Sequence, residues 1–254
     1  MESENEVKEF ETIIYEKKGN VASITLNRPE KHNCLSHQML DDLGASLDYA
    51  EADETTNVLI LKANGKSFCS GFDTKGSYYT TPPEEGWNYR NSYNILNKRV
   101  YARYTQIFNY PKVTIAQIHG RCSDAGCYMQ LSCDISIAAD NAQLGHPAQK
   151  WGGPASTPMF QFCMGPKKAR FVLWSGRLFD GKQAEAMNLV SWSVPPEDLE
   201  KEVNALAAEI AEIPRDGMLA NKVTMNTDLK IRGVDALFDY YGQMNRYMRF
   251  LPKE

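Results

Sequence analysis

The sequence has no long apolar run and no excess of positive charge. None of its 254 residues lies in a stretch of about 18 consecutive apolar residues, so no segment is predicted to span a bilayer. The first ten residues, MESENEVKEF, are acidic, unlike the basic and apolar start of a secretion signal. A formal net charge of −4 argues against a nucleic-acid-binding protein, which normally carries a basic patch. We therefore expect a cytoplasmic protein that binds neither membranes nor nucleic acid.

Cysteine and histidine are sparse, and neither follows a metal-binding pattern. The six cysteines show no Cys-x-x-Cys spacing, and several stand in apolar stretches, which favours reduced thiols in the core. Cys122 and Cys127 could pair, but a reducing compartment disfavours a disulfide. The four histidines lie far apart and include no i, i+4 pair of the kind that holds zinc on a helix. The spacings predict no metal site.

The order of the apolar patterns indicates the fold class. Two alternating segments, FETIIYEKK and VASITLN, flank Gly19-Asn20 and predict a β-hairpin. Further strand patterns at 57–63, 113–120, 133–140 and 189–194 are separated by helical patterns at 36–53, 93–107 and 165–176. Ser36 is the expected N-cap of the first helix, and Tyr93, Leu96, Val100 and Ile107 are expected on the inner face of the second. This order predicts an α/β fold with a largely parallel sheet built from β-β-α units.

The last part of the chain has a different pattern. From Pro196 onward the sequence reads as helical throughout, and PEDLEKEVNALAAEIAEI is strongly amphipathic. We therefore divide the chain into a spiral core, residues 1–195, and a helical C-terminal lobe, residues 196–254.

Two glycine-bearing turns each follow a strand pattern and are expected to open a helix. They are SFCSGFD, residues 67–73, and GRCSDAGCYM, residues 120–129. The first N–H groups of a helix have no partner within it, and small side chains allow a ligand oxygen to approach them. Two such turns together could form an oxyanion hole. The alternative is a pair of ordinary strand-to-helix turns.

Four segments in order resemble the crotonase (enoyl-CoA hydratase/isomerase) superfamily, from about Glu11 to about Ala220. The resemblance implies a crotonase-like spiral of β-β-α units with a helical C-terminal lobe, assembled as a homotrimer or a dimer of trimers. It also implies an acyl group carried as a coenzyme A thioester, with no further cofactor. The thioester carbonyl would accept hydrogen bonds from the N–H groups of Ser70 and Ala125. The four segments are ITLNRPEKHNCLS, SFCSGFDTK, IHGRCSDAGCYMQLSCDISIAADNAQLGHP and LWSGRLFDGKQAEAMNLV.

The same resemblance places the two glutamates of the hydratase branch at Tyr128 and Ala148, so both carboxylates are missing. Four candidates remain for acid/base work in their place, and the fourth is the tyrosine pair Tyr240 and Tyr241 near the C-terminus. His146 is of a residue type that suits proton transfer, but it could equally be a structural imidazole. Asp124, which replaces a usual glycine, could act as a base, orient a water or cap the following helix. Tyr128 could donate a hydrogen bond or form part of the pocket wall.

Substrate-binding residues are assigned by the resemblance as well. The nucleotide and phosphates of coenzyme A are expected near Lys31, the backbone of Cys34, and Lys66 or Lys75, since lysine binds phosphate. Asp73 is expected to cap a helix. The acyl pocket is expected to have an aromatic border, and a tyrosine pair near the C-terminus resembles the feruloyl-CoA hydratase-lyase branch. These aromatic residues are Phe72, Tyr78, Tyr79, Trp87, Tyr240 and Tyr241.

Three functions remain open from the sequence. The first is an acyl-CoA enzyme, a lyase before other classes, that hydrates or isomerises an enoyl-CoA or hydrolytically cleaves a cyclic 3-oxoacyl-CoA with a nonstandard acid/base. The second is a catalytically inactive CoA-binding or scaffold protein of the same fold. The third is an unrelated α/β protein whose glycine turns bind nothing.

Overall fold

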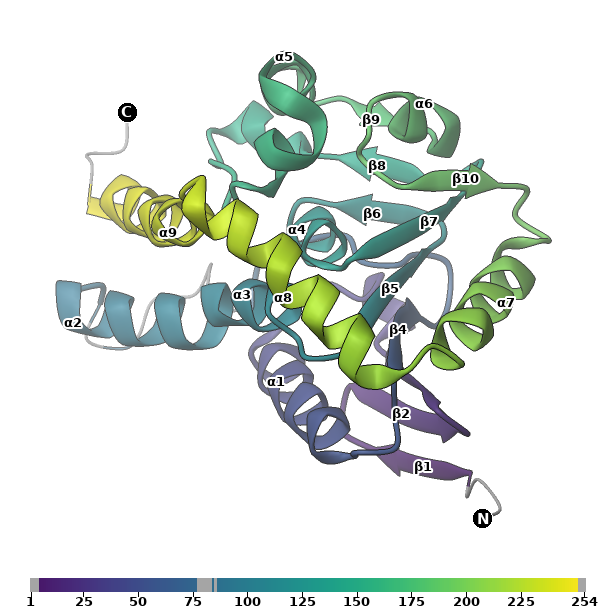
Figure 1. Cartoon of the computed structure of the whole chain (residues 1–254). Helices are drawn as coiled ribbons and strands as arrows, with labels where there is room; N and C mark the ends of the chain where they lie inside the picture. The colour runs from purple at the N-terminus through teal and green to yellow at the C-terminus, as the bar shows by residue number, and fades with distance from the viewer. Residues whose placement is uncertain (1–4, 77–83, 85, 251–254) are drawn as a thin grey trace.

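A seven-stranded sheet runs through the middle of the molecule (Figure 1). The computed structural model describes residues 5–76, 84 and 86–250. The sheet order is β1-β2-β3-β4-β5-β7-β10, antiparallel between the first three strands and parallel from β3 to β10. This order confirms the predicted hairpin and the α/β class. The strands are β1 (Glu6–Glu9), β2 (Ile13–Lys18), β3 (Val21–Leu26), β4 (Val58–Ala63), β5 (Val113–Ile118), β7 (Ile135–Ala139) and β10 (Trp192–Val194).

A smaller sheet continues two of these strands and produces the predicted β-β-α units. It has the order β6-β8-β9, formed by β6 (Arg121–Ser123), β8 (Gln143–Gly145) and β9 (Leu178–Phe179). The chain passes from β5 to β6 at Gly120, which has φ +54°. A Cβ atom at this position would lie 1.9 Å from the carbonyl oxygen of Lys66, so only glycine fits here. This close approach brings the two glycine turns together.

Helix α1 (His37–Ala52) covers the N-terminal strands as its sequence predicts. The Ser36 hydroxyl accepts a hydrogen bond from the N–H of Met39 at 3.1 Å, which confirms the predicted N-cap. The apolar stripe of the helix is buried, with Leu40, Leu43 and Leu47 each at most 2% exposed.

The second helical stretch consists of three consecutive segments, and the middle one is π-helical. These are α2 (Tyr89–Ser92), η2 (Tyr93–Tyr101) and α3 (Ala102–Phe108). Leu96, Val100 and Ile107 are buried as predicted, but Tyr93 is 44% exposed and stacks on Tyr89. The prediction for Tyr93 is wrong because a π-helix has more residues per turn than the 3.6-residue period on which the prediction was based.

The middle of the chain adds short helices around the smaller sheet and one longer helix, α5 (Met159–Ser175). Helix α5 begins six residues before the pattern predicted and bends where Gly165, with φ +73° and ψ 164°, precedes Pro166. The other segments are η1 (Pro29–Lys31), α4 (Ala125–Ser132), η3 (Pro147–Trp151) and α6 (Gly181–Ala186).

The chain after Pro196 is helical, as predicted, and comprises α7 (Leu199–Ala211), α8 (Arg215–Ile231) and α9 (Val234–Phe250). Helix α7 packs against β3, β4, β5 and β7, so it belongs to the layer that covers the sheet, whereas α9 packs against α8 and η2 (Figure 1). The predicted lobe therefore shares its first helix with the core. Among the described helices, none has the length and apolar character needed to cross a bilayer.

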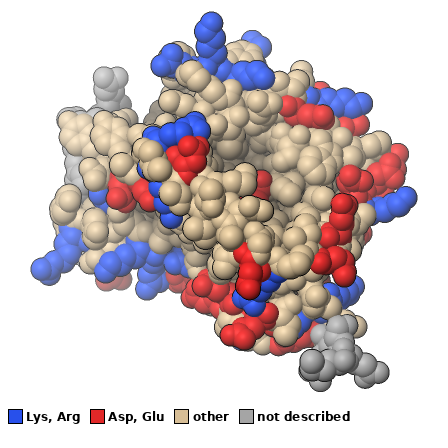
Figure 2. Space-filling view, viewed as in Figure 1, with Lys and Arg blue, Asp and Glu red and all other residues tan. Residues whose placement is uncertain are grey.

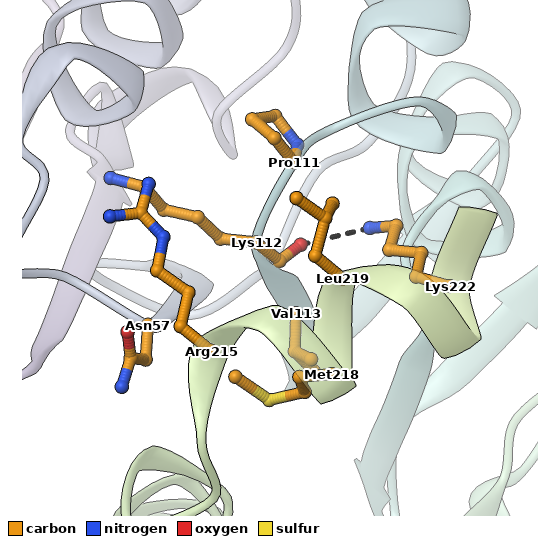
Figure 3. A pocket seen from close by; sticks show the side chains of 8 residues that line it. All are labelled: Asn57, Pro111, Lys112, Val113, Arg215, Met218, Leu219 and Lys222. Atoms are coloured by element: carbon orange, nitrogen blue, oxygen red, sulfur yellow. Dashed lines mark hydrogen bonds between the residues drawn. The ribbon is translucent and has the colours of Figure 1, made fainter.

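Three cations, two from α8 and one from the residue before β5, lie where α8 contacts the sheet (Figure 3). Lys222 of α8 donates to the carbonyl oxygen of Lys112 at 2.9 Å, and Arg215 donates to the carbonyl oxygen of Glu54. The cavity between them has a volume of about 10 Å³, which is space for about one water molecule. These groups therefore attach α8 to the core and do not form a ligand site.

Candidate active site

The two glycine turns lie side by side. The N–H of Cys69 donates to the carbonyl of Arg121 at 3.0 Å, and the N–H of Ser123 donates to the carbonyl of Cys69 at 2.9 Å. A Cβ atom on Gly126 would lie 2.5 Å from the carbonyl oxygen of Cys69, so the second turn needs glycine for this contact. The arrangement meets the first requirement of an oxyanion site, which is that both turns reach the same space.

Helix α4 supplies N–H donors from the second turn. It begins at Ala125, which is fully buried, and the N–H groups of its first turn have no partner within the helix. The positive end of the helix dipole lies at the same place. Ala125 therefore lies at the start of α4, and its role as an oxyanion donor stays a prediction.

The first turn differs from the prediction. The N–H of Ser70 donates to the carbonyl of His32 at 3.1 Å, which contradicts the predicted role of Ser70 as an oxyanion donor. The next residues form a parallel bridge with Leu35, whose N–H donates to Gly71 and whose carbonyl accepts from Asp73. In such a bridge the N–H of Phe72 points away from Leu35. Phe72 was expected to contact the acyl group through its side chain. In this geometry its backbone N–H is the group of the first turn that could donate to a ligand.

Asp124 lies between the turns in an unusual backbone conformation. Its φ of +52° with ψ of −114° is rare for a residue with a Cβ atom. Its side chain makes no capping bond to α4, so the helix-cap alternative is wrong. Instead Oδ1 accepts from the N–H of Ala148 at 3.0 Å and lies 2.9 Å from Nδ1 of His146. A Cβ atom on Gly71 would lie 3.4 Å from Oδ2, so the other carboxylate oxygen faces the first turn.

His146 and Tyr128 lie behind this carboxylate. The imidazole is fully buried, its Nε2 is 2.9 Å from the carbonyl oxygen of Gly153, and the Tyr128 hydroxyl is 3.2 Å from Nδ1. Tyr128 packs edge-on against Tyr104 and Phe160. The structure thus brings together three of the four acid/base candidates that the sequence suggests, namely Asp124, Tyr128 and His146.

The two positions to which the resemblance assigns the hydratase glutamates are both in contact with this group. Ala148 donates its N–H to Asp124, and Tyr128 contacts His146. The Asp124 carboxylate, with a side chain that is 16% exposed, therefore lies between these two positions. A carboxylate is present in the site, but it comes from the turn before α4.

A polar cavity of about 600 Å³ opens beside the first turn. Lys66 contributes to it, as predicted for a phosphate-binding residue, whereas Lys31 and Lys75 are not part of its lining. Sequence reasoning missed Arg121, which lies within the second glycine segment, and His32, which follows Lys31 in the segment ITLNRPEKHNCLS. His32 is oriented by Ser67, at 3.0 Å between Nδ1 and Oγ. The lining residues are His32, Lys66, Ser67, Ser70, Gly120, Arg121, Asn141 and Gln143.

Asp73 and Cys34 have structural environments. Asp73 does not begin a helix; it accepts from the N–H of Lys75 at 2.9 Å and pairs with Arg28 at 2.7 Å, so the helix-cap prediction is wrong. The hydrogen bond from Lys75 and the Arg28 guanidinium hold the pKa of Asp73 below its usual range. Burial raises the pKa of the Cys34 thiol, which makes it a poor nucleophile.

The predicted aromatic border is only partly described. Tyr78 and Tyr79 lie outside the described residues. Tyr240 is 55% exposed on α9, and within the described part of the chain no contact joins it to Asp124 or His146. Burial raises the pKa of Tyr241. The described residues include no group of three His, Cys, Asp or Glu side chains that could hold a metal ion.

The paired turns, the helix N-terminus and the β-β-α core define a crotonase-type α/β protein. A profile of the family described as enoyl-CoA hydratase/isomerase matches residues 16–246. The chain belongs to this family, which confirms the resemblance seen in the sequence.

Relatives named as enoyl-CoA hydratases support the assignment. One from Thermus thermophilus is 33% identical over 202 residues, covering 79% of this chain and 78% of the relative. Another, from Mycobacterium tuberculosis, is 30% identical over 250 residues, covering 91% and 79%. The crystal structure of an enoyl-CoA hydratase/isomerase from Xanthobacter autotrophicus Py2 superposes with a TM-score of 0.87 at 28% identity, covering 94% of this chain and 87% of that one.

Proposed function

We propose that this protein is an enzyme that binds an acyl-CoA thioester across the two turns and moves a proton on the acyl group with Asp124. Family membership supports acyl-CoA processing in general. The observation that carries the proposal is the Asp124 carboxylate, which lies beside the N-terminus of α4 and faces Gly71.

The proposed chemistry begins at the thioester carbonyl. Its oxygen accepts a hydrogen bond from Ala125 at the start of α4, and the backbone of the turn at Phe72 supplies the second donor. Donors and a helix dipole fixed at this oxygen stabilise the negative charge of an enolate. Loss of a proton from the adjacent carbon, or addition of water to a conjugated double bond, becomes easier for the same reason.

Asp124 then transfers the proton. In hydration, the carboxylate takes a proton from water as the water oxygen bonds to the β-carbon, and it returns that proton to the α-carbon. In isomerisation, it takes a proton from the α-carbon and returns it to the γ-carbon. Both reactions balance with one carboxylate, and hydrolytic cleavage of a cyclic 3-oxoacyl-CoA is a third use of the same enolate site. Of these enzyme classes, we propose a lyase before an isomerase or a hydrolase.

The polar cavity is the proposed seat for the phosphate groups of coenzyme A. Lys66 and Arg121 line it, and both are residue types that bind phosphate. The cavity borders the first turn through Ser70, and in this proposal the thioester extends from there past Phe72 toward Asp124.

A second candidate function is a CoA-binding protein without turnover. The observation in its favour is that Tyr128 and Ala148 occupy the positions of both hydratase glutamates. It differs from the first candidate in whether Asp124 is needed for any reaction.

A turnover screen separates the two. Purified protein is mixed with linear and cyclic enoyl- and 3-oxoacyl-CoA thioesters, with mass spectrometry for water addition and chromatography for isomers. Asp124→Asn should lower kcat by about 10²- to 10⁴-fold, because the amide keeps the shape but cannot accept the proton. Asp228→Asn, an exposed change on α8, should keep full activity. Binding of CoA thioesters with no turnover of any would favour the second candidate.

A further inference from the structure

We infer that His146 is a positioning residue for Asp124 and that it acts as an imidazolium, with a proton on each ring nitrogen. The inference deepens the proposed function, because it rests on Asp124 as the group that meets the substrate. It assigns the buried imidazole a role in holding and ionising the carboxylate, without contact with the substrate.

The first proton is fixed by Gly153. Its carbonyl oxygen lies 2.9 Å from Nε2 of His146, and a carbonyl oxygen can only accept. Nε2 must therefore carry a hydrogen.

The second proton is fixed by Asp124. Nδ1 lies 2.9 Å from Oδ1, and two lone pairs at this distance would repel, so a proton lies between them. Oδ1 also accepts from the N–H of Ala148 at 3.0 Å, which favours a carboxylate oxygen over a hydroxyl. Asp124 directly precedes α4, whose positive end favours the negative charge as well. The proton therefore belongs to Nδ1, and the ring is cationic.

The surroundings of the ring support an ion pair with a single charged partner. The hydroxyl oxygen of Tyr128 on α4 also lies 3.2 Å from Nδ1, where it can accept from the same N–H, and the rings of Tyr128 and of Phe160 on α5 pack against the imidazole with centroids at 5.8 and 6.3 Å. Asp124 is the charged group among these contacts. A buried cation needs such a partner, since burial of an unpaired charge is very costly.

Burial decides which member of the pair reaches the substrate. The His146 side chain is 0% exposed and that of Asp124 is 16% exposed. The two donors, from His146 and Ala148, hold the carboxylate in place although its residue has a rare backbone conformation. Loss of the donor at Nδ1 would free the carboxylate to rotate away from the turns.

Nuclear magnetic resonance tests the protonation state directly. In protein labelled with ¹⁵N at its histidines, one ring should show two protonated nitrogens at about pH 8, where an ordinary histidine is neutral. His146→Asn identifies that signal by its loss. A neutral ring for His146 at this pH would overturn the inference, whether or not the protein turns over any thioester.

Two amide substitutions test the positioning role. Asparagine places its amide nitrogen near the position of Nδ1 and keeps a donor for Asp124. Glutamine places its amide nitrogen near Nε2 and keeps only the donor for Gly153. We expect kcat to fall by about 100-fold or more in His146→Gln and by about 10-fold in His146→Asn, with KM little changed in both.

The matched control is His119→Gln, because His119 also contacts a carbonyl oxygen, that of Gly65 at 2.9 Å, but stands outside the site. It should keep wild-type kcat. Equal kcat values for the two His146 variants, or losses that follow their unfolding temperatures, would contradict a positioning role. No turnover by the wild type would instead count against the proposed function and leave the result from magnetic resonance standing.

Discussion

Gly71 and Asp124 occupy one crowded space, and this makes Gly71 a test of the site. Gly71 has φ +111°, and a Cβ atom there would lie 3.2 Å from Cβ of Asp124. Gly71→Ala should lower kcat/KM at least about 10-fold, because the methyl group displaces the carboxylate, and should lower the free energy of unfolding by about 1–2 kcal/mol through backbone strain. Steady-state kinetics and urea unfolding measure both effects.

Gly217 is the control for that change, since it lies in the first turn of α8 with no heavy atom within 4 Å of an added Cβ. Gly217→Ala should raise the free energy of unfolding by about 0.5–1 kcal/mol and leave activity unchanged. Wild-type activity in Gly71→Ala would show that Asp124 does not depend on this space.

Asp53 should make the free energy of unfolding depend on pH in the acidic range. Although burial acts to raise it, hydrogen bonds from Lys17, Thr56 and Thr55 hold the pKa of Asp53 well below its usual range. A carboxyl with a lowered folded-state pKa stabilises the fold above its unfolded pKa of about 4, and this contribution is lost as pH falls further. Asp53→Asn should therefore cost about 2 kcal/mol at neutral pH and much less near pH 2.

Urea unfolding of wild type and variant at both pH values checks this prediction. Asp228→Asn is the control, because Asp228 forms an exposed ion pair with Arg232 and should matter by less than about 0.5 kcal/mol at either pH. An equal cost of Asp53→Asn at both pH values would contradict the expected linkage.

The sequence was informative about which residues matter and less so about where they point. Asp124 and His146 could be named because they lie next to recognisable turn segments. Their pairing could not be predicted, since it depends on the positive φ of Asp124 and on a carbonyl at Gly153. Ser70 was misassigned because its N–H is taken by His32, which belongs to the loop after β3.

At the scale of elements, local signals succeeded where one period held throughout. Helix α1 has an N-cap and a regular apolar stripe, and the sequence predicted both correctly. The π-helical segment η2 has no such signal in the apolar pattern. The bend in α5 does have one, since Gly165 precedes Pro166, and the helix predicted from residue 165 onward coincides with the part of α5 after the bend.

Helix α8 depends on one buried lysine for its attachment to the sheet. Lys222 donates to the carbonyl of Lys112 (Figure 3). It also donates to Asp134 at 2.6 Å, and Asp134 accepts from the N–H of Thr114. Lys222→Met should lower the free energy of unfolding by about 3 kcal/mol, because it leaves Asp134 without its cation. Denaturant unfolding measures the change.

Lys230→Met is the matched control on the same helix, where the side chain is exposed, and it should change the free energy by less than about 0.5 kcal/mol. Similar values for the two variants would mean that the Asp134 pair does not hold α8.

At the scale of the whole molecule, acidic and basic side chains gather in different regions of the surface. Figure 2 shows acidic side chains along α7 and basic ones over α5. Residues 141–179 contain five Lys and Arg and no acidic residue, although the chain as a whole has a net charge of −4. Opposite charge in two separate regions of the surface suits head-to-tail contacts between copies better than contacts between like regions.

An apolar cavity of about 490 Å³ beside α8 provides a surface for such a contact. Met225, which is 68% exposed, and Ile213, which is 46% exposed, are among its lining residues. Apolar surface of this kind marks interaction sites.

We predict that the 28.7 kDa chain sediments as a trimer or a multiple of a trimer, and that Met225→Glu shifts it to the monomer. Because the side chain is exposed within one chain, urea unfolding of the monomeric variant should remain cooperative. Val7→Glu, on an equally exposed valine of β1, should leave the assembly intact. A wild-type protein that sediments as a monomer at every concentration would contradict the predicted assembly and leave the cavity beside α8 without a partner copy.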